Sequence, residues 1–533
     1  MQKRVAILFS CFIFSMGLLF AHLFCLMSDE SLQAAAIQQT TKRLELGSSR
    51  GNIYDCRGEK LVNTVGERVV VFKPTKAAET ALSACALPET VEGIFENPKK
   101  APLYAVPTAD TLYTPDAKTV QLVSRYADTP CAPHIIGYIN GEKTGVCGLE
   151  KAYDSLLRTC GGTCYARCFT DAKGRPLQNT PLFIENQHYT SPAGIRVTLD
   201  KRIQTIVEET LESYGVEKGA IVVLDVATSK ILAMASVPTF SQRAPELSLQ
   251  APNAPFLNRA VTAYSVGSVF KPVVAAAALE QGIDESFAHI CKGVEAVGST
   301  SFHCHRRQGH GLQTMFDAMA NSCNPYFIKL FAATGRETVC AMAENLGLGS
   351  AIELADHFYA PSGSMPMAEE VESPEDAANL SFGQGTLLAS PLQMAALYAA
   401  FANAGVYRAP SLMEAIVGDD GTDDMRAFLP VPRRAMSKET AERVADVLLY
   451  TVEHGSCHRA KPEDMQVCGK SGTAQSGSYQ PNGEEICHSW FCGWFPYAQP
   501  RYAVAVLKEN GAGGSLDCAP IFKTLAEKIS ALS

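Results

Sequence analysis

The residues with the clearest chemical potential are a serine and a lysine in the segment YSVGSVFKP, residues 264–272. Ser268 and Lys271 are three positions apart, and residues with that spacing share one face of a helix. Pro272 follows directly and can sit only near a helix start, because its ring clashes with the carbonyl four residues earlier. The sequence therefore predicts a helix from about Ser268 to Gly282 that begins with a hydroxyl and an amine side by side.

A lysine next to a serine is a candidate general base for activating the hydroxyl. The free pKa of lysine is about 10.4, so a base that works near neutrality needs a pKa roughly three units lower. Burial and a second nearby cation both lower a lysine pKa. The segment after Pro272, VVAAAALEQ, is apolar nearly all round, which predicts a buried helix that delivers the serine from the core to a cleft.

Two further motifs give this pair a context. They are SCN at residues 322–324 and KSGT at residues 470–473. A serine three residues before a lysine occurs by chance about once or twice in a chain of this length. The three motifs in this order, however, resemble the signature of penicillin-binding proteins and class A β-lactamases.

The resemblance extends from about Arg50 to the C-terminus. GAIVVLDVATSKILAMAS, SFGQGTLLASPLQMAALYAAFANAG and WFCGWFP are all similar to this family, and RGNIYDCRGEKLV resembles the opening of its N-terminal pedestal. The whole chain resembles a class B penicillin-binding protein, a monofunctional peptidoglycan D,D-transpeptidase. That resemblance implies an α/β transpeptidase domain of the penicillin-binding and β-lactamase-like fold, with helices flanking an antiparallel sheet. A mixed, partly β pedestal domain and one transmembrane helix would precede it.

The resemblance also implies a role for each motif residue. Ser268 attacks a D-Ala-D-Ala carbonyl, Lys271 takes the serine proton, and Ser322 relays a proton to the departing D-Ala. Backbone N–H groups of Ser268 and Thr473 hold the oxyanion. An amine of a second stem peptide resolves the acyl-enzyme and forms a cross-link. β-Lactam antibiotics would acylate the same serine, and no cofactor is implied.

The remaining motif residues are expected to bind the substrate. Lys470, Ser471 and Thr473 bind its terminal carboxylate, and Asn324 holds the donor amide. Gly472 leaves the strand edge bare, so that a substrate peptide can lie along it as an added strand. The predicted catalytic residues are therefore Ser268, Lys271, Ser322, Asn324, Lys470 and Thr473, and the predicted substrate-binding residues are Asn324, Ser471, Gly472 and Thr473.

The chain departs from the family pattern in three places. Cys323 occupies a position that varies in the family, and Ser471 stands where threonine is usual but keeps the hydroxyl. The pedestal motif usually reads Asp-Arg-Asn-Gly, whereas here Cys56 follows Asp55. This puts in doubt the contact that the family's arginine usually makes. The alternative to a structural role for Arg50 and Asp55 is that they form a solvated pair.

Sequence patterns predict the elements that position these motifs. Asp200 can cap a helix that ends at Gly215, and residues 219–236 read as a β-hairpin. Residues 489–495 and 501–509 read as a second antiparallel pair before a C-terminal helix. We predict a pedestal domain at 47–190, a linker at 190–197 and a transpeptidase domain at 215–533, whose sheet joins its first and last segments.

The segment from Val5 to Met27 carries no formal charge with His22 neutral, and it is long enough to cross a bilayer. Lys3 and Arg4 precede it, which predicts a single-pass protein of the cell membrane with a cytoplasmic N-terminus and the catalytic domain outside the cytoplasm. A cleaved signal peptide is the alternative, but the apolar stretch is longer than is usual for one. The net charge of −9 argues against a nucleic-acid partner.

The chain has 18 cysteines. The stretch with Cys160, Cys164 and Cys168, and the stretch around Cys304 with His303 and His305, lack the paired spacing of a zinc site, so we predict no bound metal. Cys323 is expected to be a small buried residue beneath the motif. A second hypothesis is a redox gate, in which a disulfide from Cys323 to Cys340 or Cys304 displaces the motif.

Four other functions are alternatives to a transpeptidase. A class A β-lactamase needs a glutamate three residues before Leu-Asn, and Ala254 occupies that position before Leu257. A penicillin-sensing receptor would carry several membrane helices. A bifunctional enzyme would need a glycan-polymerase motif, which residues 28–190 lack, so a separate membrane glycan polymerase is the expected partner. A D,D-carboxypeptidase on the same residues stays open.

Overall fold

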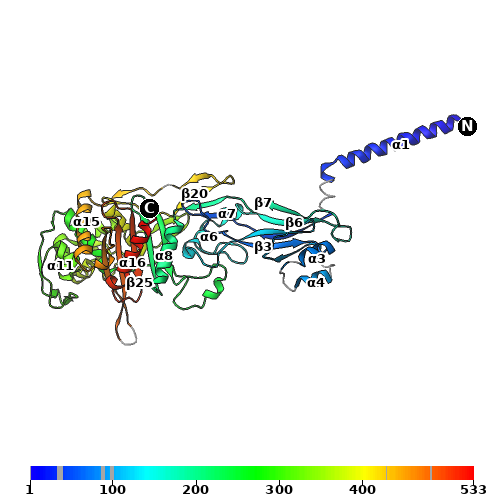
Figure 1. Cartoon of the computed structure of the whole chain (residues 1–533). Helices are drawn as coiled ribbons and strands as arrows, with labels where there is room; N and C mark the ends of the chain where they lie inside the picture. Colours follow the sequence, from blue (N-terminus) through cyan, green and yellow to red (C-terminus); the bar gives the residue numbers. More distant parts are fainter. Residues whose placement is uncertain are drawn as a thin grey trace. The chain divides into compact units, whose positions relative to one another are not determined.

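The computed structural model describes residues 2–32, 40–83, 85, 90–96, 101–427, 429–479 and 483–532 (Figure 1). Its contacts divide the chain into two compact units. The first unit comprises Met1–Gly51, Asn63–Arg125 and Thr159–Ser191, and the second comprises Asn52–Val62, Tyr126–Arg158 and Pro192–Ser533. The predicted pedestal at 47–190 therefore includes segments of both units, since Asn52–Val62 and Tyr126–Arg158 cluster with the C-terminal part of the chain.

The first unit contains helix α1, Gln2–Ser28, and two antiparallel three-stranded sheets. Among the described residues, α1 is the one helix long and apolar enough to cross a membrane, with a mean hydropathy of 2.2. The predominance of short strands agrees with the predicted partly β region. The remaining elements are β1 Thr41–Ser48, β6 Thr163–Phe169 and β7 Phe183–Gln187; β3 Val65–Phe72, β4 Tyr104–Pro107 and β5 Ala117–Ser124; and helices α3 Lys76–Leu82 and α4 Thr90–Glu96.

The second unit is built on a five-stranded antiparallel sheet of strand order β10-β9-β25-β24-β23. Both predicted antiparallel pairs are confirmed, and so is the prediction that the sheet joins the first and last segments of this domain. The strands are β9 Gly219–Asp225, β10 Ile231–Val237, β23 Cys468–Tyr479, β24 Glu485–Phe495 and β25 Tyr502–Lys508. The order leaves β23, which carries the KSGT motif, at one edge of the sheet.

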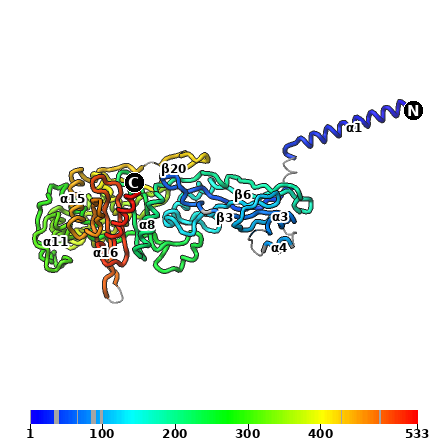
Figure 2. Tube along the Cα trace, viewed as in Figure 1, coloured from blue at the N-terminus to red at the C-terminus, as the bar shows by residue number. Residues whose placement is uncertain are grey.

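One face of this sheet packs on two terminal helices, α8 and α16, which lie side by side (Figure 2). The Asp200 carboxylate accepts a hydrogen bond from Arg202 N at the start of α8, which confirms the predicted cap. On the other side, the buried helices α9 and α14 pack in the main core. The helices of the second unit are α5 Pro133–Ile136, α6 Gly148–Ala152, α7 Asp154–Thr159, α8 Lys201–Ser213, α9 Lys271–Glu280, α10 Met315–Ala320, α11 Asn324–Thr334, α12 Arg336–Asn345, α13 Pro374–Ser381, α14 Pro391–Ala402, α15 Lys438–His454 and α16 Gly514–Ser530, with 3-10 turns at Pro245–Ser248, Gly267–Phe270, Ala368–Glu370 and His458–Ala460.

Residues 190–197, predicted as a linker, contain a buried strand instead. Strand β8, Gly194–Val197, lies between β2, Asn52–Tyr54, and β20, Met413–Val417, in a sheet that continues to β21, Asp423–Arg426. The smaller two-stranded sheets pair β11 Tyr264–Ser265 with β18 Leu388–Ala389, β12 His289–Cys291 with β15 Gly311–Gln313, β13 Val294–Val297 with β14 Thr300–His303, β16 Ile352–Ala355 with β17 Phe358–Ala360, and β19 Val406–Tyr407 with β22 Arg433–Arg434.

Candidate functional site

The candidate nucleophile Ser268 lies in a 3-10 turn that runs directly into α9. The predicted helix start is confirmed, because Pro272 is the second residue of α9 and its missing N–H is not needed there. Gly267 has a φ of 62°, and a Cβ at this position would lie 2.9 Å from the Thr473 carbonyl oxygen. A glycine therefore allows the serine turn to pack directly against β23.

Lys271 is fully buried, and its amine contacts the SCN motif. Its Nζ lies 2.8 Å from the Ser322 carbonyl oxygen, 2.8 Å from Asn324 Oδ1 and 3.2 Å from Ser322 Oγ. Ser322 Oγ in turn lies 3.0 Å from Ser268 Oγ. These contacts link the Ser268 hydroxyl to the Lys271 amine through the hydroxyl of Ser322.

The three contacts of Lys271 Nζ suit an ammonium, which can donate to all three oxygens, and they also suit a neutral amine. A carbonyl oxygen and an amide oxygen can only accept hydrogen bonds, so they use two N–H groups of Nζ. A neutral amine then has one lone pair left, and the remaining contact is the hydroxyl of Ser322. In that state Ser268 can donate its proton to Ser322 while Ser322 donates its own to Lys271. The geometry thus provides a path that takes a proton away from the Ser268 oxygen.

The surroundings of Lys271 favour this neutral form. Burial lowers the pKa of Lys271 well below its ordinary value, and the positive charge of Lys470 lowers it further. Burial also lowers the pKa of Lys470. Lys271 can therefore act as a base at a pH far below the ordinary pKa of lysine.

This shift predicts the pH dependence of serine acylation. The base must be deprotonated, so the rate rises with pH up to the pKa of Lys271 and is constant above it. Because that pKa is lowered, we expect the rate constant for acylation by a β-lactam to reach its plateau well below the ordinary pKa of lysine. Stopped-flow measurements from pH 5 to 10 test this. A rate that climbs about tenfold per pH unit up to pH 10 would contradict a depressed pKa.

The SCN segment joins α10 to α11 in an unusual backbone conformation. Ser322 has a φ of 50°, a left-handed conformation that is uncommon for a residue with a side chain. Asn324 is the first residue of α11, and Cys323 before it is fully buried. This confirms the prediction that Cys323 is a small buried residue beneath the motif, and the structure adds that both its neighbours contact Lys271.

The KSGT motif lies on the edge strand β23 beside the serine turn. Lys470 is fully buried and its Nζ lies 2.8 Å from the Ser471 carbonyl oxygen, whereas Thr473 is exposed. A Cβ on Gly472 would lie 3.0 Å from the Val266 carbonyl oxygen and 3.1 Å from Val269 Cγ1. Gly472 thus allows close packing of β23 on the serine turn, a role that the sequence reasoning did not identify.

The upstream pair Arg50 and Asp55 is not solvated, so that alternative is wrong. Both residues are buried. Asp55 Oδ1 accepts hydrogen bonds from Arg57 N at 2.9 Å and Glu59 N at 2.7 Å, and Oδ2 accepts one from Lys201 N at 3.2 Å. Asp55 therefore organises its own turn and caps the first residue of α8.

The candidate metal ligands are distributed differently from the prediction. Of the residues that the structure describes, one group has ligand atoms close enough for a shared ion, namely Cys291, Cys304, His310 and Cys323. Cys304 was a sequence candidate, but Cys160, Cys164 and Cys168 do not belong to this group. Sequence reasoning missed Cys291 and His310. The sequence feature near both is a glycine, in CKG and in GHG.

Comparisons with known proteins agree with this geometry. Residues 219–527 match the family described as "Penicillin binding protein transpeptidase domain". Stage V sporulation protein D of Bacillus subtilis is 26% identical, with 92% of this chain and 79% of the relative aligned. Peptidoglycan D,D-transpeptidase PbpA of Mycobacterium tuberculosis is 30% identical over 63% of this chain and 72% of its own length.

A solved structure described as "Structural coordination of polymerization and crosslinking by a peptidoglycan synthase complex" has a similar fold. Its TM-score is 0.72 at 24% identity, and the match covers 99% of both chains.

Proposed function

This chain belongs to the penicillin-binding protein transpeptidase family, and from that premise we propose that it is a class B enzyme, a serine D,D-transpeptidase that cross-links peptidoglycan stem peptides. The observation that carries the proposal is the chain of contacts from Ser268 Oγ through Ser322 Oγ to the buried amine of Lys271. A neutral amine at the end of that path can activate the serine for attack on a peptide carbonyl.

In the first half-reaction, Ser268 Oγ attacks the carbonyl between the two terminal D-alanines of a donor peptide. The serine proton passes through Ser322 to Lys271, and backbone N–H groups of Ser268 and Thr473 stabilise the oxyanion. The same proton returns through Ser322 to the amine of the departing D-alanine. Ser322 therefore relays the proton in both steps, from Ser268 to Lys271 and back to the departing D-alanine. The family resemblance implied only the second of these steps.

Binding of the donor peptide uses the remaining motif residues. The edge position of β23 supports pairing of the peptide with this strand, and the exposed Thr473 is accessible to its terminal carboxylate. Lys470, although buried, supplies positive charge beneath the strand, and Ser471 contributes its hydroxyl. Asn324 can hold the donor amide through the side chain that also contacts Lys271. β-Lactams, as analogues of this donor, acylate Ser268.

Mass spectrometry of the full chain with a thioester donor and a D-amino-acid acceptor tests the proposal. We expect an acyl adduct on Ser268 and a product in which the acceptor replaces the leaving group. A donor that is acylated onto Ser268 but only hydrolysed in the presence of acceptor would instead identify a D,D-carboxypeptidase. An adduct on another residue would contradict the assigned nucleophile.

We further propose that α1 anchors the protein in the cell membrane with the N-terminus in the cytoplasm and the second unit outside it. Its length and mean hydropathy of 2.2 support a membrane span, and Lys3 and Arg4 at its start support this orientation. Cysteine accessibility on the two sides of the membrane in cells distinguishes this orientation from the reverse.

The enzyme is expected to depend on a separate glycan polymerase in the membrane. Residues 28–190 lack a polymerase motif, and the similar fold of a peptidoglycan synthase complex supports such a partner. We expect the purified chain alone to leave a lipid-linked precursor unpolymerised, and to cross-link strands when a polymerase supplies them. Gel analysis of glycan chains measures this. Glycan chains made by the pure protein would contradict it.

A further inference from the structure

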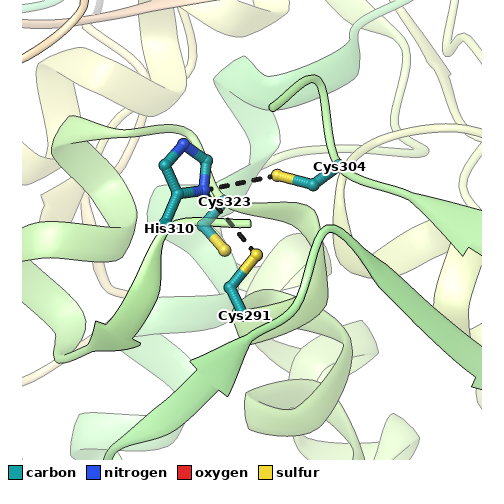
Figure 3. A group of neighbouring side chains, drawn as sticks. All are labelled: Cys291, Cys304, His310 and Cys323. Atoms are coloured by element: carbon teal, nitrogen blue, oxygen red, sulfur yellow. Dashed lines mark hydrogen bonds between the residues drawn. The ribbon is translucent and has the colours of Figure 1, made fainter. Parts of the chain in front are cut away.

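Three cysteines and one histidine meet directly beneath the SCN motif, although they come from four separate segments (Figure 3). Cys291 ends β12, Cys304 follows β14, His310 precedes β15, and Cys323 precedes α11. Their ligand atoms all lie within 4.8 Å of one another. All three thiols are free in the structure. In Figure 3 the side chains converge on one point instead of pairing off.

The distances in this cluster match those around a tetrahedral metal ion. His310 Nδ1 lies 3.4 Å from Cys304 Sγ and 3.7 Å from Cys291 Sγ. With zinc–sulfur bonds of about 2.3 Å and zinc–nitrogen bonds of about 2.1 Å, tetrahedral geometry places nitrogen and sulfur about 3.6 Å apart. The two measured distances lie on either side of this value, and a single nitrogen atom makes both contacts.

The three thiols are buried, as are several other cysteines of the chain, but these three surround one imidazole. Cys291, Cys304 and Cys323 are 2%, 1% and 0% exposed, and His310 is half-buried above them. Three sulfur atoms and one imidazole thus gather in a pocket closed to solvent on the sulfur side. This is the ligand set of a closed structural zinc site, in which the protein supplies all four ligands.

The loops that carry the ligands are shaped to approach each other closely. Gly293 and Gly309 have φ values of 87° and 82°. A Cβ on Gly293 would lie 2.0 Å from the Arg307 carbonyl oxygen, and one on Gly309 would lie 2.2 Å from the Cys291 carbonyl oxygen. Only glycine fits at both positions. The two glycines therefore hold the loops of Cys291, Cys304 and His310 together at the base of the β13–β14 hairpin.

That hairpin has no fully buried side chain in its two strands, since β13 alternates between exposed and half-buried residues and β14 is exposed except at Phe302, which is half-buried. An isolated two-stranded hairpin is only marginally stable in water. A bound metal at its base would supply the stability that its own packing lacks.

We propose that Cys291, Cys304, His310 and Cys323 bind one Zn²⁺ ion in a closed, tetrahedral structural site. Three thiolates and an imidazole favour zinc over hard cations such as Mg²⁺ or Ca²⁺. Binding replaces the thiol protons, which leave to solvent, and requires no oxidant or reductant. With a neutral imidazole, the occupied site carries a net charge of −1.

The zinc ion would fix the position of the SCN segment, residues 322–324, through its bond to Cys323. Cys323 is flanked by Ser322 and Asn324, which contact Lys271, and Ser322 has the left-handed φ of 50°. Asn324 Nδ2 also lies 3.5 Å from the carbonyl oxygen of His303, next to Cys304. A metal bound to Cys323 and Cys304 therefore restrains both sides of Asn324. The ion is a positioning element for this segment, bound through Cys323 and not through Ser322 or Asn324.

The first test is the metal content of the full chain, purified in detergent through a tag that contains no histidine. Inductively coupled plasma mass spectrometry is expected to find one zinc per chain that survives dialysis against a weak chelator. Exchange for Co²⁺ should give sulfur-to-cobalt charge-transfer bands and the intense visible bands of tetrahedral coordination. A chain without tightly bound zinc, or a cobalt spectrum of octahedral type, would overturn the proposal.

Two cysteine variants then assign the site. Cys291 and Cys340 are both 2% exposed, but Cys340 lies on α12, outside the cluster. We expect Cys291→Ser to lower zinc affinity by at least about tenfold, whereas Cys340→Ser keeps the zinc of the wild type. Equal zinc contents in the two variants would refute the assignment. If Cys291→Ser does not fold, the cobalt spectrum of the wild type still decides the question.

Peptide mapping without reductant separates zinc binding from the redox gate. The gate requires a disulfide from Cys323, and Cys304 is the nearer of the two partners considered for it. A zinc-free chain with a Cys304–Cys323 disulfide would overturn the zinc site in favour of the gate. With zinc bound, we expect the three thiols to resist alkylation until a strong chelator is added. Chelation should then slow β-lactam acylation, and added zinc should restore it.

Discussion

Replacement of Ser268 by alanine is expected to abolish covalent labelling by a fluorescent penicillin. Alanine has no oxygen that can form the acyl ester, and the other hydroxyl beside Lys271, that of Ser322, relays the proton and is not the nucleophile. Ser268 is half-buried, and its hydroxyl contacts that of Ser322, a hydrogen bond worth about 1 kcal/mol. The variant should therefore stay folded. Labelling is measured by gel fluorescence and by intact mass.

Ser265→Ala is a suitable control, because it removes one hydroxyl from a half-buried position of the same segment. Ser265 uses its backbone oxygen to accept a hydrogen bond from Trp490 Nε1, and that contact survives the substitution. We expect this variant to label like the wild type. A Ser268→Ala protein that gains the mass of the antibiotic would require another nucleophile.

Replacement of Lys271 by methionine is expected to slow acylation by about 10²- to 10⁴-fold, the usual contribution of a general base. Methionine has a similar length but cannot accept a proton, so the path from Ser268 through Ser322 ends without a base. The change also leaves the Ser322 carbonyl oxygen without its contact to Nζ. Some loss of stability should accompany the loss of rate, and thermal unfolding measures that part separately.

Lys73→Met provides the matched control for burial. Lys73 is also fully buried, but it lies in the first unit, where it pairs with Asp116 and donates a hydrogen bond to the Thr180 carbonyl oxygen at 2.6 Å. We expect this variant to be destabilised, because Asp116 loses its partner. Its acylation rate should nevertheless stay close to that of the wild type. If Lys271→Met acylated as fast as Lys73→Met, Lys271 would not be the base.

Local features of the sequence predicted much of the second unit. The cap at Asp200, the helix start at Pro272 and both antiparallel strand pairs of the main sheet depend on neighbouring residues, and the structure confirms them. A cap, a proline ring and a period-two apolar pattern act within one or two turns of chain. The three motifs were sufficient to identify the family for the same reason, because each is a short run with its own spacing.

Long-range packing decided the features that the sequence reasoning missed or misplaced. The stretch at 190–197 has the composition of a linker, but β8 is buried because strands from residues 52–54 and 413–417 pair with both of its edges. The packing role of Gly472 follows from the approach of Val266 and Val269, which no spacing within the motif reveals.

The tertiary structure also decided the chemistry around the SCN motif. The family resemblance predicted a catalytic role for Ser322, while its position between Ser268 and Lys271 results from packing of α9 against α11. From the sequence, Cys323 was expected to be a small buried residue or, in the second hypothesis, to form a disulfide with Cys340 or Cys304. Cys291 and His310 reach Cys323 only because β12 pairs with β15 and brings both residues under the motif. The four ligands come from four segments that only the folded chain brings together. The order of cysteines and histidines along the sequence therefore does not reveal the metal site.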